Sequence, residues 1–162
     1  MRLVQCDSSP KRRHRESQMA RLLVAEDDRL MRWSLEKYLS HGGHAVHSVD
    51  SGDEAIEAAK CDEYRVVITD YALPGSDGLH VLQSIKARNP QVHVIVITGQ
   101  AAPQRERLAR DTGAFEFLEK PFQLVALKQA VERALVTPER RKGPRSCCGK
   151  CVWGMPCDHW SR

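Results

Sequence analysis

The sequence predicts an α/β protein in which a parallel five-stranded sheet lies between two helical layers, a doubly wound three-layer α/β/α sandwich. Five short apolar or alternating runs, typical of strands, alternate with five segments of helical periodicity between residues 19 and 137. The connections between them are short, which favours right-handed crossovers and a sheet covered on both faces. The 162 residues leave room for one such domain and two tails.

The first half of the domain is expected to contain three strands, over residues 21–26, 44–49 and 64–70. Two helices, over about residues 29–41 and 52–60, lie between them. Short polar side chains precede both helices and accept hydrogen bonds from free first-turn amides, so Asp28 is expected to cap the first helix and Asp50 or Ser51 the second. The apolar positions of the first helix include Leu30, Trp33, Leu35, Tyr38 and Leu39.

The second half is expected to contain helices over about residues 78–88, 103–111 and 122–136, and strands over 92–98 and 115–118. The helix over 103–111 is the most polar of the five and the strand over 115–118 is the least apolar. This pair is predicted to form either a mobile, partner-facing surface or a merely solvated edge of the sheet.

The composition is that of a globular protein, with 41% hydrophobic and 28% charged residues. No apolar stretch approaches the roughly 18 residues needed to cross a membrane. Residues 1–18 lack the apolar segment of a secretory signal, so we expect a cytoplasmic protein without membrane contact. The net charge of +4 comes from the two ends of the chain, which is weak support for a DNA-binding domain.

The two ends are predicted to lie outside the folded domain, which is expected to span residues 19–137. Residues 1–18 form a basic, unpatterned extension, and residues 138–162 form a basic, Cys-rich tail; both are expected to be disordered. Met19 stands directly before the first strand, and we hypothesise that translation starts there.

Polar side chains follow four of the five expected strands at the point where each strand ends. These side chains are Glu26, Asp27 and Asp28 after the first strand, Asp70 after the third, Thr98 after the fourth and Lys120 just past the fifth. In a doubly wound sheet the first, third and fourth strands meet near the switch point, where ligands bind. Clustered carboxylates repel one another, and a hard divalent cation such as Mg²⁺ relieves that repulsion.

This set of residues suits phosphoryl transfer. Asp70 would be the nucleophile that forms an aspartyl phosphate, while Thr98 and Lys120 contact phosphoryl oxygens. Each residue also has an ordinary explanation, because acids after strands cap helices, threonines are common in strands and lysines are usually exposed. The occurrence of all of them at four strand ends, in this order, favours the phosphoryl-transfer interpretation.

Four segments resemble the receiver domains of bacterial two-component response regulators: LVAEDD at 23–28, VITDYALPGSDG at 67–78, VITG at 96–99 and FLEKPF at 117–122. They occur in the family's order within residues 21–136. The resemblance implies a flavodoxin-like (βα)5 fold. It also implies phosphorylation by a sensor histidine kinase or a phosphotransfer protein of a phosphorelay, with Mg²⁺ or Mn²⁺.

The same resemblance implies a role for each residue at the strand ends. Asp70 would be the phospho-acceptor, and Lys120 would pair with the phosphoryl group. Glu26, Asp27 and Asp70, with the backbone carbonyl of Ala72 and Asp28 as a further candidate, would bind the metal; Glu26 stands where the family more often has Asp. Thr98 and Phe117 would be the switch residues, and the Lys120–Pro121 peptide bond would be cis.

Phosphorylation would then change the protein contacts made by the face that the fourth helix, the fifth strand and the last helix share. The partners implied are the kinase, an unidentified downstream protein and, in a phosphorylation-dependent dimer, a second copy; otherwise the protein is a monomer. One alternative is a receiver-like interaction module that works without phosphorylation. The other is a small Asp-nucleophile phosphatase, but the haloacid-dehalogenase type needs a second Asp where this chain has Ala72. We therefore expect no enzyme activity beyond self-phosphorylation and self-dephosphorylation.

One further feature concerns how the protein passes its signal on. The segment Met31–Glu36 resembles receivers of enhancer-binding transcription activators, but residues 137–162 are too few for a helix-turn-helix or ATPase domain, so we expect action through protein contacts and no direct DNA binding.

In the tail, Cys148, Cys151, Cys157 and His159 supply four zinc ligands, although the loop between the pairs is shorter than in usual zinc fingers. The alternative is a tail without a metal.

Overall fold

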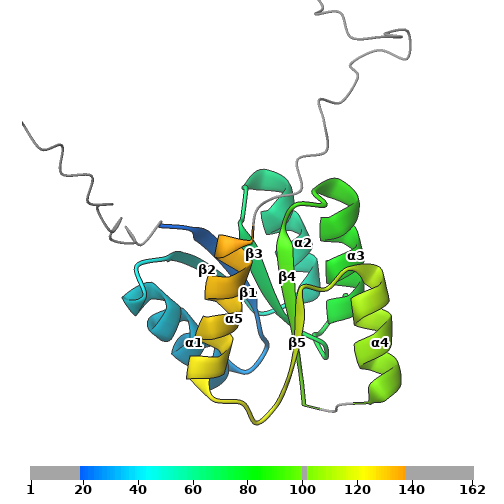
Figure 1. Cartoon of the computed structure of the whole chain (residues 1–162). Coiled ribbons are helices and arrows are strands. Elements are labelled where there is room, and N and C mark those ends of the chain that lie inside the picture. Colours follow the sequence, from blue (N-terminus) through cyan, green and yellow to red (C-terminus); the bar gives the residue numbers. More distant parts are fainter. Residues whose placement is uncertain (1–18, 100–101, 138–162) are drawn as a thin grey trace, which may run out of the picture.

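The computed structural model describes residues 19–99 and 102–137. The five strands form one parallel sheet in the order β2-β1-β3-β4-β5. The strands are β1 (Arg21–Ala25), β2 (Ala45–Val49), β3 (Val66–Asp70), β4 (His93–Thr98) and β5 (Glu116–Glu119). The helices are α1 (Arg29–His41), α2 (Gly52–Cys61), α3 (Gly78–Arg88), α4 (Pro103–Thr112) and α5 (Leu124–Val136). This arrangement confirms the predicted flavodoxin-like, doubly wound sandwich (Figure 1).

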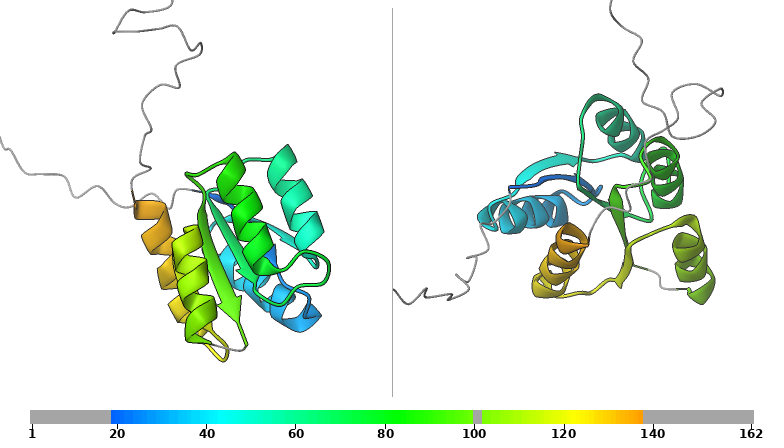
Figure 2. Two further views of the ribbon diagram at one scale, coloured as in Figure 1. Left: turned by 90° about the vertical axis from the view of Figure 1, so that its right-hand side faces the viewer. Right: turned by 45° about the horizontal axis from the view of Figure 1, so that its top comes forward.

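The helices form two layers with a separate hydrophobic core under each. α1 and α5 cover one face of the sheet, and α2, α3 and α4 cover the other (Figures 1 and 2). β3 contributes to both cores, because alternate side chains of a strand point to opposite faces: Val67 packs under α3, and Val66 and Ile68 pack toward α1 and α5. The central strands are therefore buried on both faces, which explains their nearly continuous apolar sequence.

The helix caps agree with the polar residues predicted for them. Asp28 accepts a hydrogen bond from the Met31 amide at 2.7 Å, and Ser51, the second of the two candidates for α2, accepts one from the Glu54 amide at 3.3 Å. These bonds satisfy amides that have no partner within the helix. The side chains of both caps therefore serve local structure.

Not all the apolar residues of α1 face the core. Leu35 and Leu39 are buried, but Leu30 is 76% exposed and Trp33 is 60% exposed. Leu35 and Leu39 are four residues apart and lie on one helical face, whereas Leu30 and Trp33 lie on another. The helix therefore has more apolar residues than it buries against the core.

Several element boundaries differ from the prediction by one or two residues: β1 ends at Ala25 and not at 26, β3 begins at Val66 and not at 64, and β4 begins at His93 and not at 92. α5 begins at Leu124, after Gln123, and not at residue 122, although Phe122 still packs against the core beneath α1 and α5. β5 covers Glu116–Glu119 and not 115–118, because its pairing with β4 extends to Thr98 opposite Glu119. The predicted extensions, residues 1–18 and 138–162, lie outside the described residues. Within the described ranges, none of the helices combines the length and the apolar character that crossing a membrane requires.

His44, just before β2, gives a pH-dependent prediction. Its Nδ1 is buried and has no hydrogen-bond partner within residues 19–99 and 102–137. Burial lowers the pKa of His44; the carboxylate of Glu132 opposes this, and the ammonium group of Lys128 adds to it. As the pH falls below the ordinary histidine value of about 6.5, the unfolded chain takes up a proton that the folded chain resists. The free energy of unfolding should therefore decrease as the pH is lowered through this window.

We expect His44→Asn to flatten that slope, measured as the free energy of unfolding in urea at several pH values. His41→Asn, a change at an exposed side chain at the end of α1, is the matched control and should keep the wild-type slope. An unchanged slope in His44→Asn would contradict the prediction.

Candidate functional site

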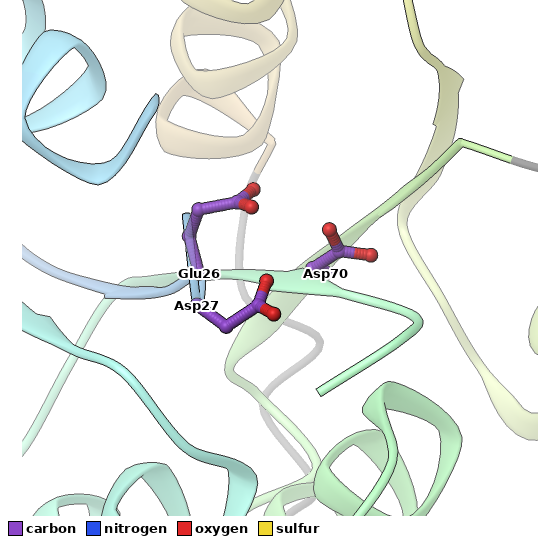
Figure 3. A group of neighbouring side chains, drawn as sticks. All are labelled: Glu26, Asp27 and Asp70. Atoms are coloured by element: carbon purple, nitrogen blue, oxygen red, sulfur yellow. The ribbon is translucent and has the colours of Figure 1, made fainter. Parts of the chain in front are cut away.

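Three carboxylates gather where β1 and β3 end. Glu26 and Asp27 directly follow β1, and Asp70 is the last residue of β3. Because these strands are parallel neighbours in the sheet, their ends place the three side chains at one edge (Figure 3). One carboxylate oxygen from each lies within 4.8 Å of the other two, so the group could hold a divalent metal ion. Glu26 and Asp70 are buried, and Asp27 is exposed.

Lys120 bridges the two buried carboxylates. It follows β5, and its Nζ donates hydrogen bonds to Glu26 Oε1 at 2.9 Å and Oε2 at 2.8 Å, and to Asp70 Oδ2 at 2.5 Å. The backbone anchors this position, because the Lys120 amide donates to the Thr98 carbonyl at 2.7 Å. The Lys120–Pro121 peptide bond is cis, as the resemblance implied.

The electrostatics of this cluster reflect its burial. Glu26 is only 1% exposed, and burial raises the pKa of its carboxyl; the Lys120 ammonium opposes the rise and the Asp70 carboxylate adds to it. Burial by itself lowers the pKa of Lys120, but its hydrogen bonds to Asp70 and Glu26 outweigh burial and leave that pKa raised. Lys120 is therefore a firmly held cation between two carboxylates that would otherwise repel each other.

The loop after Asp70 is fixed by its backbone. Asp70 Oδ1 accepts a hydrogen bond from the Ala72 amide at 2.9 Å, the Tyr71 amide donates to the Ile97 carbonyl at 2.7 Å, and the Gly78 amide donates to the Tyr71 carbonyl at 2.9 Å. Residue 78 must also be small, because a Cβ there would lie 2.2 Å from the Asp70 carbonyl oxygen and 2.8 Å from Tyr71 Cα. The start of α3 therefore packs directly against the backbone of Asp70.

This contact predicts a large effect for Gly78→Ala. The new methyl group can be accommodated only if the backbone of Asp70 moves, which should cost about 1–3 kcal/mol of stability and displace the carboxylate. Gly99→Ala is the matched control, because none of the described atoms lies within 4 Å of a Cβ at that position. Thermal unfolding of both variants tests the prediction. Equal melting temperatures for the two variants would contradict it.

The other predicted site residues lie in different parts of the chain, and not all of them belong to the carboxylate cluster. Thr98 is the buried last residue of β4, the strand next to β3. Phe117, in β5, is half-buried and packs against the core beneath α2, α3 and α4. Asp28 is not brought into the carboxylate group, because its Oδ1 caps α1 instead. The four residues of the predicted zinc site, Cys148, Cys151, Cys157 and His159, lie outside the described residues.

Sequence reasoning missed Arg32 as a candidate site residue. Its Nη1 donates to the Glu26 carbonyl at 2.6 Å and to the Asp27 carbonyl at 3.3 Å. A local signal was available, because Arg32 lies near the N-terminus of α1, where the helix dipole disfavours a cation. A cation near the start of a helix therefore indicates a favourable contact elsewhere that offsets the unfavourable dipole.

Sequence reasoning also missed contacts that join the loop after β3 to neighbouring helices. The Arg105 guanidinium of α4 lies 5.0 Å from the centroid of the Tyr71 ring. On the other side, Ser76 donates to Asp53 Oδ1 of α2 at 2.6 Å and lies 2.9 Å from His80 Nδ1. The Arg105–Tyr71 and Ser76–Asp53 contacts pair residues that are far apart in the sequence, so no local pattern predicts them.

Comparisons with known proteins agree with this geometry. Residues 22–132 match the response regulator receiver domain family. The chain is 32% identical to the DNA-binding transcriptional regulator NtrC of Klebsiella pneumoniae over 123 residues, covering 76% of this chain and 26% of that protein. It is 37% identical to the response regulator protein FleR of Pseudomonas aeruginosa over 114 residues, covering 70% and 24%. The chain thus spans about a quarter of the length of these relatives.

Solved structures give the same answer. The receiver domain of NtrX from Brucella abortus superposes with a TM-score of 0.68 and 34% identity, covering 72% of this chain and 99% of that one. A receiver domain from Clostridium thermocellum superposes with a TM-score of 0.69 and 31% identity, covering 72% and 94%. With the match over residues 22–132, these likenesses show that the chain belongs to the response regulator receiver domain family of two-component systems.

Proposed function

We propose that this chain is a phosphorylatable response regulator that accepts a phosphoryl group on Asp70 in a Mg²⁺-dependent reaction. The donor is a histidine kinase or a phosphotransfer protein. The observation that carries the proposal is the meeting of the Asp70 carboxylate, the acidic pair Glu26 and Asp27, and the Lys120 ammonium at one edge of the sheet.

The transfer itself is a displacement at phosphorus. A carboxylate oxygen of Asp70 forms the new P–O bond while the P–N bond to the donor imidazole breaks, and the leaving imidazole takes up a proton. Lys120, already 2.5 Å from Asp70 Oδ2, is positioned to pair with the phosphoryl oxygens. Its release from Glu26 would free that carboxylate for other ligands.

The donor set fits Mg²⁺ or Mn²⁺, because carboxylate oxygens are hard ligands and three of them converge here. Glu26, Asp27 and Asp70 would hold the ion, together with the backbone carbonyl of Ala72. When bound, the ion neutralises charge and orients a phosphoryl oxygen. Its charge would also relieve the repulsion between Asp70 and Glu26 that adds to the raised pKa of Glu26.

Phosphorylation would alter the α4-β5-α5 face through Thr98 and Phe117. Thr98 ends β4 beside Asp70's strand, and Phe117 lies on β5 at the edge of the sheet. A shift of the Thr98 hydroxyl toward the phosphoryl group would open space for the Phe117 ring and change which protein the face binds. We propose that this phosphoacceptor acts through such protein contacts and not as an enzyme on free substrates.

Phosphorylation by a small donor tests the proposal. The protein is incubated with acetyl phosphate, and intact-mass spectrometry should detect one added phosphoryl group with Mg²⁺ and none with EDTA. Absence of the adduct at saturating Mg²⁺ would overturn the proposal. Beryllofluoride, a mimic of the phosphoryl group, should in addition change which proteins a pull-down recovers.

A further inference from the structure

We propose that Arg32 is a positioning residue for the acidic pair: its guanidinium holds the β1–α1 loop so that the side chains of Glu26 and Asp27 face Asp70. This inference rests on the proposed function, because it assigns to Arg32 the preorganisation of the metal-binding carboxylates. Arg32 touches neither the carboxylate group of Glu26 nor that of Asp27 in the hydrogen bonds described; it acts through their backbone.

The bonds of Arg32 fix the loop on the side facing α1. Nη1 donates to the Glu26 carbonyl at 2.6 Å and to the Asp27 carbonyl at 3.3 Å. On the opposite side, the Glu26 amide donates to the Val49 carbonyl of β2 at 3.2 Å. The peptide groups on both sides of Glu26 are therefore tied to different elements, which sets the direction of its Cα–Cβ bond.

The loop that Arg32 holds is short. Only residues 26–28 separate β1 from α1, and each of them has a distinct task. Asp28 caps the helix, while Glu26 and Asp27 supply two of the three carboxylates of the cluster. Rotation of the peptide between Glu26 and Asp27 would move both side chains at once, so a clamp on their carbonyls fixes both.

Charge alone does not explain Arg32. A cation near the start of a helix opposes the helix dipole, and a cation beside a divalent-metal site weakens metal binding by repulsion. The Arg32 side chain is only 20% exposed, and its Nη2 lies 3.9 Å from Asp50 Oδ2, a weak ion pair. The two carbonyl bonds are the favourable contacts that offset these costs.

The forked guanidinium is suited to this task. One of its nitrogens reaches both carbonyls while another points toward Asp50 of the β2–α2 loop. A lysine ammonium carries the same charge as a compact point on a flexible stem and does not reproduce a planar fork. Arg32→Lys therefore separates geometry from charge.

The test is Mg²⁺ binding measured by calorimetry in wild type, Arg32→Lys and Arg32→Met. Positioning predicts that Arg32→Lys weakens Mg²⁺ binding about 10-fold, as loss of an outer-shell partner does at other metal sites. A purely electrostatic role predicts wild-type affinity in Arg32→Lys and tighter binding in Arg32→Met, and that result would overturn the inference. Arg29→Lys, an exposed change in the same turn of α1, is the matched control and should bind Mg²⁺ like wild type.

A kinetic readout separates positioning from loss of fold. With acetyl phosphate as donor, Arg32→Lys should need about 10-fold more Mg²⁺ for half-maximal phosphorylation and reach the wild-type rate at saturation. A lower maximal rate with unchanged Mg²⁺ dependence would overturn the inference and indicate a general structural role. If wild type itself binds no Mg²⁺ and takes up no phosphoryl group, the proposed function fails; if only the Arg32→Lys effect is missing, the inference alone fails.

Discussion

Asp70→Asn is expected to abolish Mg²⁺-dependent phosphorylation by acetyl phosphate while the fold is retained. Asparagine has the shape of aspartate, and its side-chain oxygen can still accept the hydrogen bond that Asp70 Oδ1 receives from the Ala72 amide at 2.9 Å. A neutral amide oxygen, however, is a far weaker nucleophile toward phosphorus than a carboxylate.

The measurement is the fraction of protein that carries a phosphoryl group in intact-mass spectrometry after incubation with acetyl phosphate and Mg²⁺. Asp111→Asn, which removes an exposed carboxylate of α4, is the matched control and should be phosphorylated like wild type. A hydroxylamine-sensitive adduct on the Asp70→Asn variant would show that another residue is the acceptor.

The same variant should change stability only modestly. The substitution removes the carboxylate that helps to raise the pKa of Glu26, and it weakens the bond from Lys120 Nζ. Relief of the repulsion with Glu26 stabilises the fold, whereas the weaker bond from Lys120 destabilises it. Because the two effects partly cancel, we expect a change in the free energy of unfolding below about 2 kcal/mol. The loss of phosphorylation therefore reports chemistry and not unfolding.

Lys120→Met is expected to give the second large effect, a loss of about 3 kcal/mol of stability in the absence of Mg²⁺. The substitution keeps much of the aliphatic stem but removes the ammonium group that bonds to Glu26 and Asp70. Two buried carboxylates then face each other without a counter-ion. Mg²⁺ should restore part of the stability, because a divalent ion can replace the missing positive charge.

The pH dependence of Lys120→Met follows from Glu26. Burial already raises the pKa of Glu26; Lys120 is the main group that opposes this rise, and the Asp28 backbone adds a smaller opposing contribution. Without Lys120 that pKa rises further, so the folded state retains a proton over a pH range in which the unfolded state has lost it. A carboxyl with a raised folded-state pKa destabilises increasingly as the pH rises through that range. The stability deficit should therefore be largest at high pH and shrink as the pH is lowered.

Thermal unfolding with and without Mg²⁺, over a range of pH, tests both expectations. Lys128→Met, which removes a partly exposed lysine of α5 lying 4.0 Å from Glu132, is the control and should shift stability by less than about 1 kcal/mol. A smaller Mg²⁺-induced rise in melting temperature for Lys120→Met than for wild type would contradict the prediction.

Much of the fold could be predicted from local pattern. The continuous apolar run of β3 indicates a strand buried on both faces, whereas the apolar positions of α1 include the exposed Leu30 and Trp33 as well as the buried Leu35 and Leu39. Boundaries were less predictable. β5 ends where its pairing with β4 ends, and the apolar Phe122 packs against the core without belonging to α5. Pairing and packing depend on a second element, which a single segment does not describe.

The candidate site shows the same division. Because parallel strands end at one edge of a sheet, the sequence by itself predicted that Glu26, Asp27 and Asp70 would lie together, and their carboxylate oxygens do so within 4.8 Å. Asp28 has the same chemistry and stands next in the chain, yet the start of α1 takes it as a cap. The choice between ligand and cap depends on side-chain direction, which the order of residues does not specify.

Side-chain partners were decided by the tertiary structure. Lys120 bonds to Glu26 across 94 positions of sequence, and Arg32 selects two backbone carbonyls that are chemically like every other carbonyl in the chain. Local periodicity carries information about which face of an element is apolar and where the element ends, because those depend on neighbours in sequence. Which hydrogen-bond donor meets which acceptor depends on how whole elements pack against one another. Only the tertiary structure brings donor and acceptor within hydrogen-bonding distance.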